Sequence, residues 1–233
     1  MKGEVPVSKK IIRDIRLLKS GMKNESGEDV TAYFADKKLY AMTQRIVMKL
    51  RENGFSLGDF DHLFINFSSA EAGGKMYISE KIDRYHPWLR NCYVPIDVEL
   101  YDNLCKPESY VAITDCISTV LATCFATEDF DEARIHLCVQ QAVEQGERML
   151  MKYKEKSSAK RKAVVFLRYL DTCKFYPLLQ VYDAEDHLLL EKYLPESVTL
   201  DYLGEIQVST KRVTIVPRKN AFTARNTPLV FEY

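Results

Sequence analysis

The sequence predicts an α+β fold in which two or three central helices pack on a largely antiparallel sheet and the C-terminal third is rich in strands. Two long segments, 107–125 and 130–156, repeat apolar side chains every three or four residues, as helices do. After residue 162, apolar and polar residues alternate as they do in strands. Because helices and strands are segregated along the chain, an α+β fold is favoured over a doubly wound parallel sheet.

The length of 233 residues suits one large domain or two small ones. We expect a single α+β domain over 1–233. It could be subdivided into a mixed part at 1–105, a helical part at 106–162 and a β-rich part at 163–233. Hydrophobic residues make up 46% of the chain, and a chain of this length can bury a substantial core without disulfides or metals.

The first elements are a segment of ambiguous period and a long helix. Residues 8–19 fit either a helix or a strand, since their apolar positions match both periods. Residues 30–53 carry a clear apolar stripe and are predicted to be helical. Asp29 can cap the first amide groups of this helix, and Gly54 suits its C-terminal end.

Strand patterns follow this helix. Residues 61–69 alternate and are rich in β-formers, and 75–82 is the expected partner strand of a hairpin turning at "EAGGK", residues 71–75. A further short strand is predicted at 92–100, where Pro95 favours a position at an edge or a bulge.

Two central helices are predicted next. Pro107 suits the first turn of the helix at 107–125. In the helix at 130–156, Asp129 and the glutamate three residues later resemble a capping box. Gly146 lies on the apolar stripe of this second helix, which predicts that another helix packs closely there.

The C-terminal third reads as a series of strands separated by turns. The sequence "DAED" at 183–186 predicts a hairpin turn. The parity of the apolar residues changes at "STKR", 209–212, which predicts a turn or a bulge. The expected strands are 163–170, 176–183, 187–194, the two halves of 205–216, and an edge strand in the tail "NTPLVFEY".

Charge and hydropathy disfavour several classes of protein. The 33 basic and 33 acidic residues cancel, which argues against nucleic-acid binding unless the charges are segregated in space. The basic segment 152–162 is interpreted as a solvated helix end and linker, and a nucleic-acid binder using it is a third option behind protein binding and enzymatic activity. No apolar run reaches about 18 residues, and the N-terminus lacks the apolar centre of a signal peptide. We therefore expect a cytoplasmic protein without a membrane span.

No cofactor or metal is expected. The sequence lacks a phosphate-binding glycine loop, and no two cysteines are spaced as C-x-x-C. The six cysteines are interpreted as free, mostly buried side chains, and the histidines are too scattered to suggest a zinc site. These residues are Cys92, Cys105, Cys116, Cys124, Cys138 and Cys173, and His62, His86, His136 and His187.

Catalytic pairs are few. Cys92 follows His86 by six residues, and Cys116 and His136 lie on successive predicted helices, so either pair could in principle join a nucleophile to a base. Structural, buried roles fit these four residues better. The acidic groups at 59–61, 128–132 and 183–186 occupy helix starts and turns, where solvated carboxylates are expected.

The stretch "RYHPWLRNCY", residues 84–93, is the best candidate for a binding site. It concentrates the aromatic and arginine side chains that dominate protein interfaces. In the alternative, Trp88 and Leu89 fill an edge of the core and only the arginines face solvent. The candidate partner-binding residues are Arg84, Tyr85, His86, Trp88, Arg90 and Tyr93.

Two segments, "HPWLRNCYVPID" and "FLRYLDTCKFYPLLQVYD", resemble bacterial immunity proteins of polymorphic-toxin and contact-dependent-inhibition systems. The resemblance implies a non-enzymatic protein that binds one toxin domain and blocks its active site or its access to substrate. The alternative is an unrecognised enzyme or small-molecule-binding protein with a pocket near His86 and Cys92.

Overall fold

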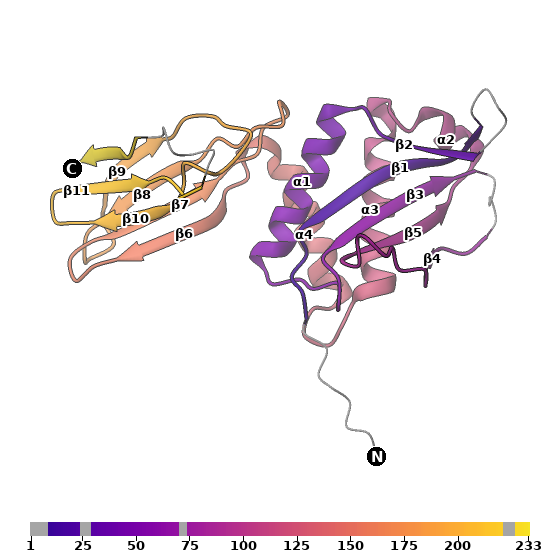
Figure 1. Cartoon of the computed structure of the whole chain (residues 1–233), viewed down its shortest axis with the longest axis horizontal. Helices are drawn as coiled ribbons and strands as arrows, with labels where there is room; N and C mark the ends of the chain where they lie inside the picture. Colours follow the sequence, from indigo (N-terminus) through magenta and orange to yellow (C-terminus); the bar gives the residue numbers. More distant parts are fainter. Residues whose placement is uncertain (1–8, 24–28, 70–73, 221–226) are drawn as a thin grey trace, which may run out of the picture. The chain divides into compact units, whose positions relative to one another are not determined.

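The computed structural model describes residues 9–23, 29–69, 74–220 and 227–233. Within these residues it has four α-helices and twelve strands in three sheets, and most strand pairs are antiparallel (Figure 1). The predicted α+β fold class is confirmed. The chain divides into two compact units, Met1–Gly146 (unit 1) and Glu147–Tyr233 (unit 2). The boundary lies inside the segment predicted as one long helix.

Unit 1 is built on a five-stranded mixed sheet with the order β2-β1-β3-β5-β4. The central pairs β1–β3 and β3–β5 are parallel, and the outer pairs β1–β2 and β4–β5 are antiparallel. The strands are β1 (Asp14–Lys23), β2 (Asp29–Tyr33), β3 (His62–Ser68), β4 (Tyr77–Ile78) and β5 (Leu89–Pro95). The ambiguous segment 8–19 therefore contributes to a strand.

Three of the four α-helices of unit 1 are capped by an aspartate at their N-terminus. Asp36, Asp97 and Asp131 each accept a hydrogen bond from the amide three residues later, at 2.7–3.0 Å. The predicted caps were wrong, because Asp29 lies in β2 and Asp129 precedes the actual cap by two residues. The helices are α1 (Lys37–Glu52), α2 (Val98–Asn103), α3 (Tyr110–Phe125, after a 3-10 turn at Pro107–Ser109) and α4 (Glu132–Gln145).

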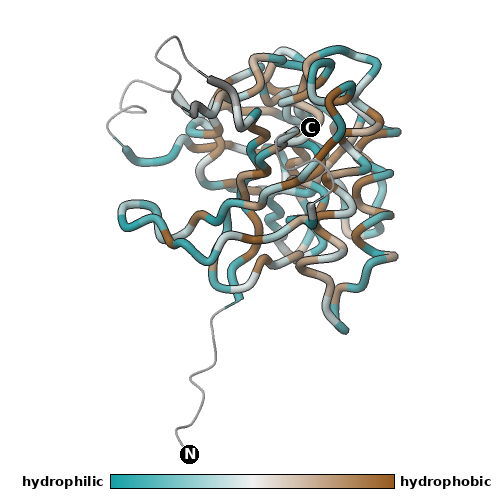
Figure 2. The backbone as a smooth tube through the Cα atoms, turned by 90° about the vertical axis from the view of Figure 1, so that its right-hand side faces the viewer, coloured by the Kyte–Doolittle hydropathy of each residue, from teal (hydrophilic) through white to brown (hydrophobic). Residues whose placement is uncertain are grey.

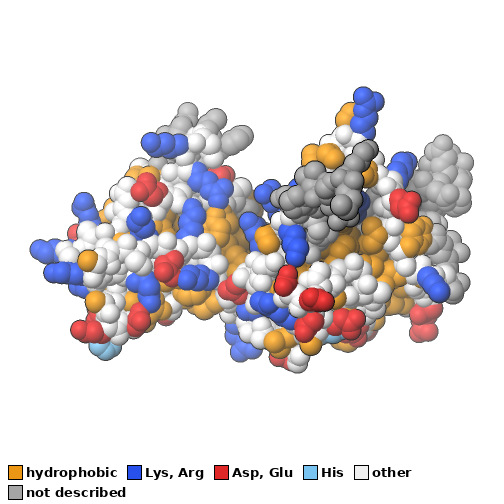
Figure 3. Space-filling model, turned by 90° about the horizontal axis from the view of Figure 1, so that it is seen from below, with side chains coloured by type: hydrophobic (Ala, Val, Ile, Leu, Met, Phe, Trp, Pro, Cys, Tyr) orange, Lys and Arg blue, Asp and Glu red, His pale blue; other side chains and the backbone are white. Residues whose placement is uncertain are grey.

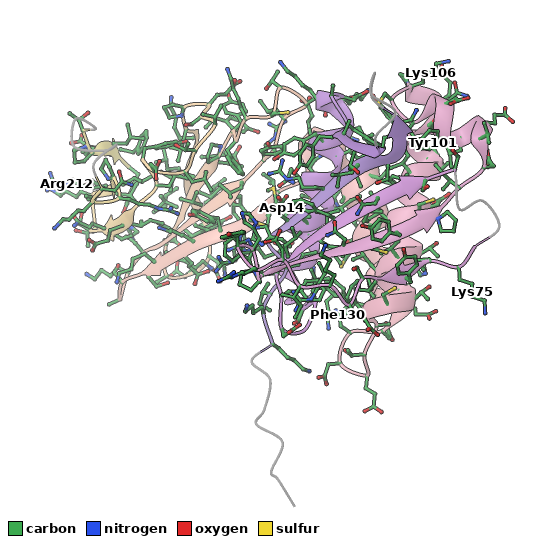
Figure 4. The ribbon with its side chains drawn as sticks, turned by 45° about the vertical axis from the view of Figure 1, so that its right-hand side comes forward. Asp14, Lys75, Tyr101, Lys106, Phe130 and Arg212 are labelled. Atoms are coloured by element: carbon green, nitrogen blue, oxygen red, sulfur yellow. The ribbon has the colours of Figure 1, made fainter. Side chains whose placement is uncertain are left out.

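The core of unit 1 is formed by the sheet and by helices α1, α3 and α4, each of which carries fully buried side chains. In Figure 1 α3 and α4 lie over one face of the sheet. Leu63, Ile65 and Phe67, alternate residues of the central strand β3, are fully buried. In Figure 2 hydrophobic stretches concentrate where strands and helices pack. Buried Tyr101 and Phe130 lie at different ends of this core in Figure 4.

The predicted helix at 130–156 is wrong in its second half. Gly146 has a φ of +52°, a backbone conformation that a helix cannot continue through, and α4 ends just before it. A short 3-10 turn follows, and Met151 begins a strand. A Cβ at Gly146 would meet nothing within 4 Å, so close helix packing is not the reason for this glycine.

The predicted hairpin of 61–69 with 75–82 is also wrong. β3 pairs with β1 and β5, and the short strand β4 pairs with β5. Residues 71–73 of the expected turn lie outside the described part of the chain. Of the strand predicted at 92–100, the first four residues belong to β5, Pro95 is its last residue, and a helix begins at Val98.

Unit 2 contains two antiparallel sheets made from consecutive hairpins, in the orders β6-β7-β8-β9 and β10-β11-β12. The predicted hairpin at "DAED" and the turn at "STKR" are confirmed. The strands are β6 (Met151–Ser157), β7 (Lys162–Leu167), β8 (Leu178–Tyr182), β9 (Leu188–Tyr193), β10 (Glu205–Val208), β11 (Arg212–Val216) and β12 (Leu229–Glu232). Ala163, Val165 and Leu167 of β7 are buried together with Val213 and Ile215 of β11.

No helix in the described ranges combines the length and the apolar character needed to cross a bilayer.

Candidate functional site

The candidate stretch forms the connection between β4 and β5 and the first half of β5. Asp83 organises the connection: its Oδ1 accepts hydrogen bonds from the amides of Tyr85 (2.7 Å) and His86 (2.9 Å). These two bonds lower the pKa of the Asp83 carboxyl, and the nearby His86 ring adds to the effect. Nδ1 of His86 lies 3.3 Å from the same carboxylate, which orients the ring.

Trp88 lies at the end of this connection and is tied to the sheet through its backbone. Its carbonyl accepts hydrogen bonds from the amides of Asp61 and His62, each at 3.1 Å. Its indole ring packs edge-on against the His86 ring, with 5.3 Å between the centroids. The Trp88 side chain is nevertheless 40% exposed, so it does not fill the core.

Three large hydrophobic side chains on this connection face solvent. Ile82 is 55% exposed, Tyr85 is 78% exposed, and Trp88 completes the set. Arg84 and His86 are exposed beside them. We call Ile82, Tyr85 and Trp88 the loop surface. Aromatic residues with a partly fixed backbone are the type that anchors protein interfaces.

Arg90 has an internal role. It is only 8% exposed, and its guanidinium donates to the carbonyls of Pro87 and Leu89, both at 2.9 Å, and to Asp59 at 3.2 Å. The guanidinium carbon also lies 5.1 Å from the centre of the Phe60 ring. These contacts hold the loop surface against the sheet. Because the Arg90 guanidinium is buried and already donates to internal acceptors, it is not available to a partner.

Tyr93 and Cys92 lie on opposite faces of β5. Tyr93 stacks on Tyr77 of β4, with 5.2 Å between the ring centres. Cys92 is fully buried, and burial raises the pKa of its thiol to about 12. The exposed His86 and the buried Cys92 therefore do not form a common pocket, and a thiol that stays protonated at neutral pH is a poor nucleophile.

In the acidic segment at 59–61, one of the two carboxylates differs from the prediction. Asp61 is buried; its Oδ1 lies 2.6 Å from Nδ1 of His62, and its Oδ2 lies 3.2 Å from Nε of Arg13. Asp59 binds Arg90. Asp59 is exposed, as predicted, whereas the prediction of a solvated carboxylate was wrong for Asp61.

The helices α3 and α4 bring together a pair that the sequence did not suggest. Oγ of Ser118 lies 2.7 Å from Nδ1 of His136, the histidine for which Cys116 was considered as a partner. The pair borders an open groove of about 530 Å³ with Asp115 and Glu144. Ser118 lies in the middle of a helix, where the backbone amides are occupied and cannot bind an oxyanion. This geometry links the two helices and does not form a catalytic centre.

One turn could hold a cation. Asp183, Glu185 and His187 lie on the β8–β9 turn, and their ligand atoms all lie within 4.8 Å of one another. Oδ1 of Asp183 already accepts the amides of Glu185 and His187, both at 2.9 Å, and these bonds lower the pKa of Asp183, with the bond from His187 the largest cause. The group belongs to one exposed hairpin turn, which holds its side chains loosely compared with a buried metal site.

The basic segment 152–162 forms β6 and its turn, so its interpretation as a helix end was wrong. Several of its cations have internal partners. Lys152 pairs with Glu155, Lys162 pairs with Asp186, and Nζ of Lys154 donates to the carbonyls of Leu203 and Gly204 in unit 2. Burial lowers the pKa of Lys154.

The candidate site therefore consists of a fixed connection with exposed aromatic residues in unit 1 and no catalytic constellation among the described residues. No protein-family model, curated protein or solved structure matches this chain.

Proposed function

We propose that this protein is a non-enzymatic binding module that contacts a protein partner through the loop surface. The observation that carries the proposal is the exposure of Ile82, Tyr85 and Trp88 on one short connection whose backbone is held at Asp83 and at β5. Exposed hydrophobic residues that gather on one segment mark interaction sites more often than single ones do.

The way the connection is held favours binding. A loop that is ordered before it meets its partner loses less conformational entropy on association. Asp83, the His86–Trp88 ring contact and the buried Arg90 each restrict the connection. The exposed rings then offer contact area at a low entropic cost, as tyrosine and tryptophan do in other interfaces.

The narrower proposal is that the partner is a toxin domain and that the protein is a cytoplasmic immunity protein. It rests on the resemblance of residues 86–97 and 166–183 to immunity proteins. In this role the loop surface would enter or cover the active site of the toxin domain. A specific interface would bury about 800 Å² on each partner, more than this connection alone supplies, so neighbouring residues would contribute.

The test compares two aromatic substitutions. The tagged wild-type chain is used to capture its partner from an extract of its own organism, and binding of the purified partner is then measured by titration calorimetry. Tyr85→Ala combined with Trp88→Ala should weaken binding at least about 100-fold, because hot-spot aromatics each contribute about 2 kcal/mol. The control is Tyr33→Ala, whose side chain is 61% exposed in β2.

The control variant should bind like the wild type. Failure of the wild-type chain to recover a stoichiometric partner would contradict the proposal, as would equal losses in the control. For the narrower proposal, the captured partner is expressed in a host cell with and without this chain. Protection of growth by the wild type, and its loss in the double variant, is the expected result.

A further inference from the structure

An open groove of about 530 Å³ runs between helices α3 and α4 of unit 1. The two helices lie side by side and are joined by the short connection 126–131, so they form an antiparallel helical hairpin (Figure 1). Each helix lines the groove with residues at the spacing i, i+3, i+4, i+7 and i+8, beginning at Val111 in α3 and at His136 in α4. This spacing is one face of a helix, so two helical faces border the groove along its length. We call it the helix groove.

The floor of the helix groove requires no polar partner. Thr114, Ser118 and Val139 are buried there. The Thr114 hydroxyl donates to carbonyls of the preceding turn of α3 at 2.8 and 3.0 Å, and Oγ of Ser118 lies 2.7 Å from Nδ1 of His136. Because both hydroxyls already have partners, an apolar occupant would leave neither of them buried and unpaired.

The rim of the helix groove combines exposed valines with carboxylates. Val111 is 71% exposed and Val143 is 39% exposed. Asp115 on α3 and Glu144 on α4 are exposed, so each side of the groove carries one carboxylate, and neither forms an ion pair with a described residue. The described residues that line the groove include no lysine or arginine. Figure 3 shows acidic side chains beside hydrophobic ones along the lower edge of unit 1.

We propose that the helix groove binds an amphipathic helix of a partner protein, with the apolar stripe of that helix between α3 and α4 and with lysine or arginine side chains on both sides of the stripe. Apolar residues at i, i+4 and i+7 of such a helix span about 10 Å, which equals the seven-residue step from Val111 to Ser118 in α3. The flanking cations would lie beside Asp115 on one side and Glu144 on the other. This surface is separate from the loop surface, and the inference does not rest on the proposed function.

The charges of the rim decide between the possible occupants. A second copy docking through the same groove would bring Asp115 and Glu144 against the same carboxylates, and like charges oppose such contacts. A nucleic acid or an anionic membrane would be repelled for the same reason. A small cation without an apolar stripe would leave the two valines uncovered. An apolar and basic helix complements both features of the groove.

Three synthetic peptides of about 18 residues test the proposal, because shorter helices are marginal in water. The first carries a leucine stripe at i, i+4 and i+7 flanked by lysines on an alanine background. The second has glutamates in place of the lysines, and the third is a scrambled version of the first that keeps its charge but has no stripe. Fluorescence anisotropy measures the binding of each labelled peptide to the full chain.

The lysine peptide should bind at least about tenfold more tightly than either of the other two. If it shows no saturable binding up to about 1 mM, the proposal is wrong. Equal binding of the scrambled peptide would also overturn it, because the groove would then attract cations without recognising a helix. Equal binding of the glutamate peptide would remove the role of the rim carboxylates.

Charge reversals on the protein locate the contact. Asp115→Lys and Glu144→Lys should each weaken binding of the lysine peptide at least about threefold. Glu80→Lys is the matched control, because Glu80 is an exposed carboxylate of the β4–β5 connection and the variant changes the net charge equally. Distant charges are largely screened at about 0.15 M salt, so the control should bind like the wild type. An equal loss in all three variants would show an effect of net charge alone and contradict the proposal.

Nuclear magnetic resonance of valine methyl groups gives an independent location. Addition of the lysine peptide should shift the signals of Val111, Val139 and Val143, and should leave Val98, which is 59% exposed in α2, unchanged. Shifts confined to valines outside the groove would refute the assignment. The variant with Tyr85→Ala and Trp88→Ala should bind the peptide like the wild type, so the outcome for the helix groove is separate from that for the loop surface.

Discussion

Replacing Arg90 with alanine should destabilise unit 1 by about 3 kcal/mol. The substitution removes two hydrogen bonds to the carbonyls of Pro87 and Leu89, and one bond to Asp59. A hydrogen bond from a charged donor contributes about 1.5–3 kcal/mol, and because both bonds are only partly buried, the lower end of that range applies to each. The bond to Asp59 contributes little to this sum, because that carboxylate side chain is 58% exposed and screened by water.

The assay is urea unfolding followed by tryptophan fluorescence. Trp88 is the only tryptophan, so its signal reports on unit 1 alone. Arg84→Ala is the control, because Arg84 is exposed, and it should change the unfolding free energy by less than about 0.5 kcal/mol. Arg90→Lys should fall between the two, because an ammonium group lacks the planar fork of donors. If Arg90→Ala unfolds at the same urea concentration as the control, the assignment of Arg90 as an internal anchor is wrong.

Three further predictions concern separate features. Gly204→Ala should destabilise unit 2 by more than about 3 kcal/mol in calorimetry, because the new Cβ would lie 2.3 Å from the carbonyl oxygen of Val216; a normal melting temperature would refute this. Cys105, which is exposed, should react with a thiol reagent at pH 8, whereas Cys92 should react only on unfolding, and mass spectrometry of labelled peptides distinguishes them. The pKa of the Asp83 carboxyl is lowered in the folded chain, so the stabilisation that this carboxylate gives the connection is complete above the usual carboxyl pKa of about 4 and is lost as the pH falls below it. The fluorescence of the nearby tryptophan should follow this loss. The transition should be absent in Asp83→Asn.

Local patterns in the sequence predicted much of the fold. Gly54 ends α1 with a φ of +79°, as its position after the apolar stripe indicates. The hairpin at 183–186 follows directly from its turn residues. The end of α4 was missed because the apolar spacing continues through Gly146, and periodicity does not record the sign of φ.

The candidate site was harder to predict, for a different reason. Composition could place Trp88 and Arg90 in one segment but could not say which of them faces solvent. Strand alternation separates Cys92 from Tyr93 only once the bounds of β5 are known. The partner of Arg90, Asp59, is 31 residues away, and no local pattern links the two. Side-chain direction in a connection depends on such tertiary contacts.

The connectivity of the three sheets also sets an order of folding. In unit 2 every strand of a sheet pairs with its neighbours in sequence, so its contacts close short loops. In unit 1 the parallel pairs β1–β3 and β3–β5 join strands separated by a helix or by another strand. Folding rates fall as the sequence separation of contacts rises. Unit 2, although it is synthesised last, should therefore fold faster than unit 1, and the central parallel strands set the slowest step for the whole chain.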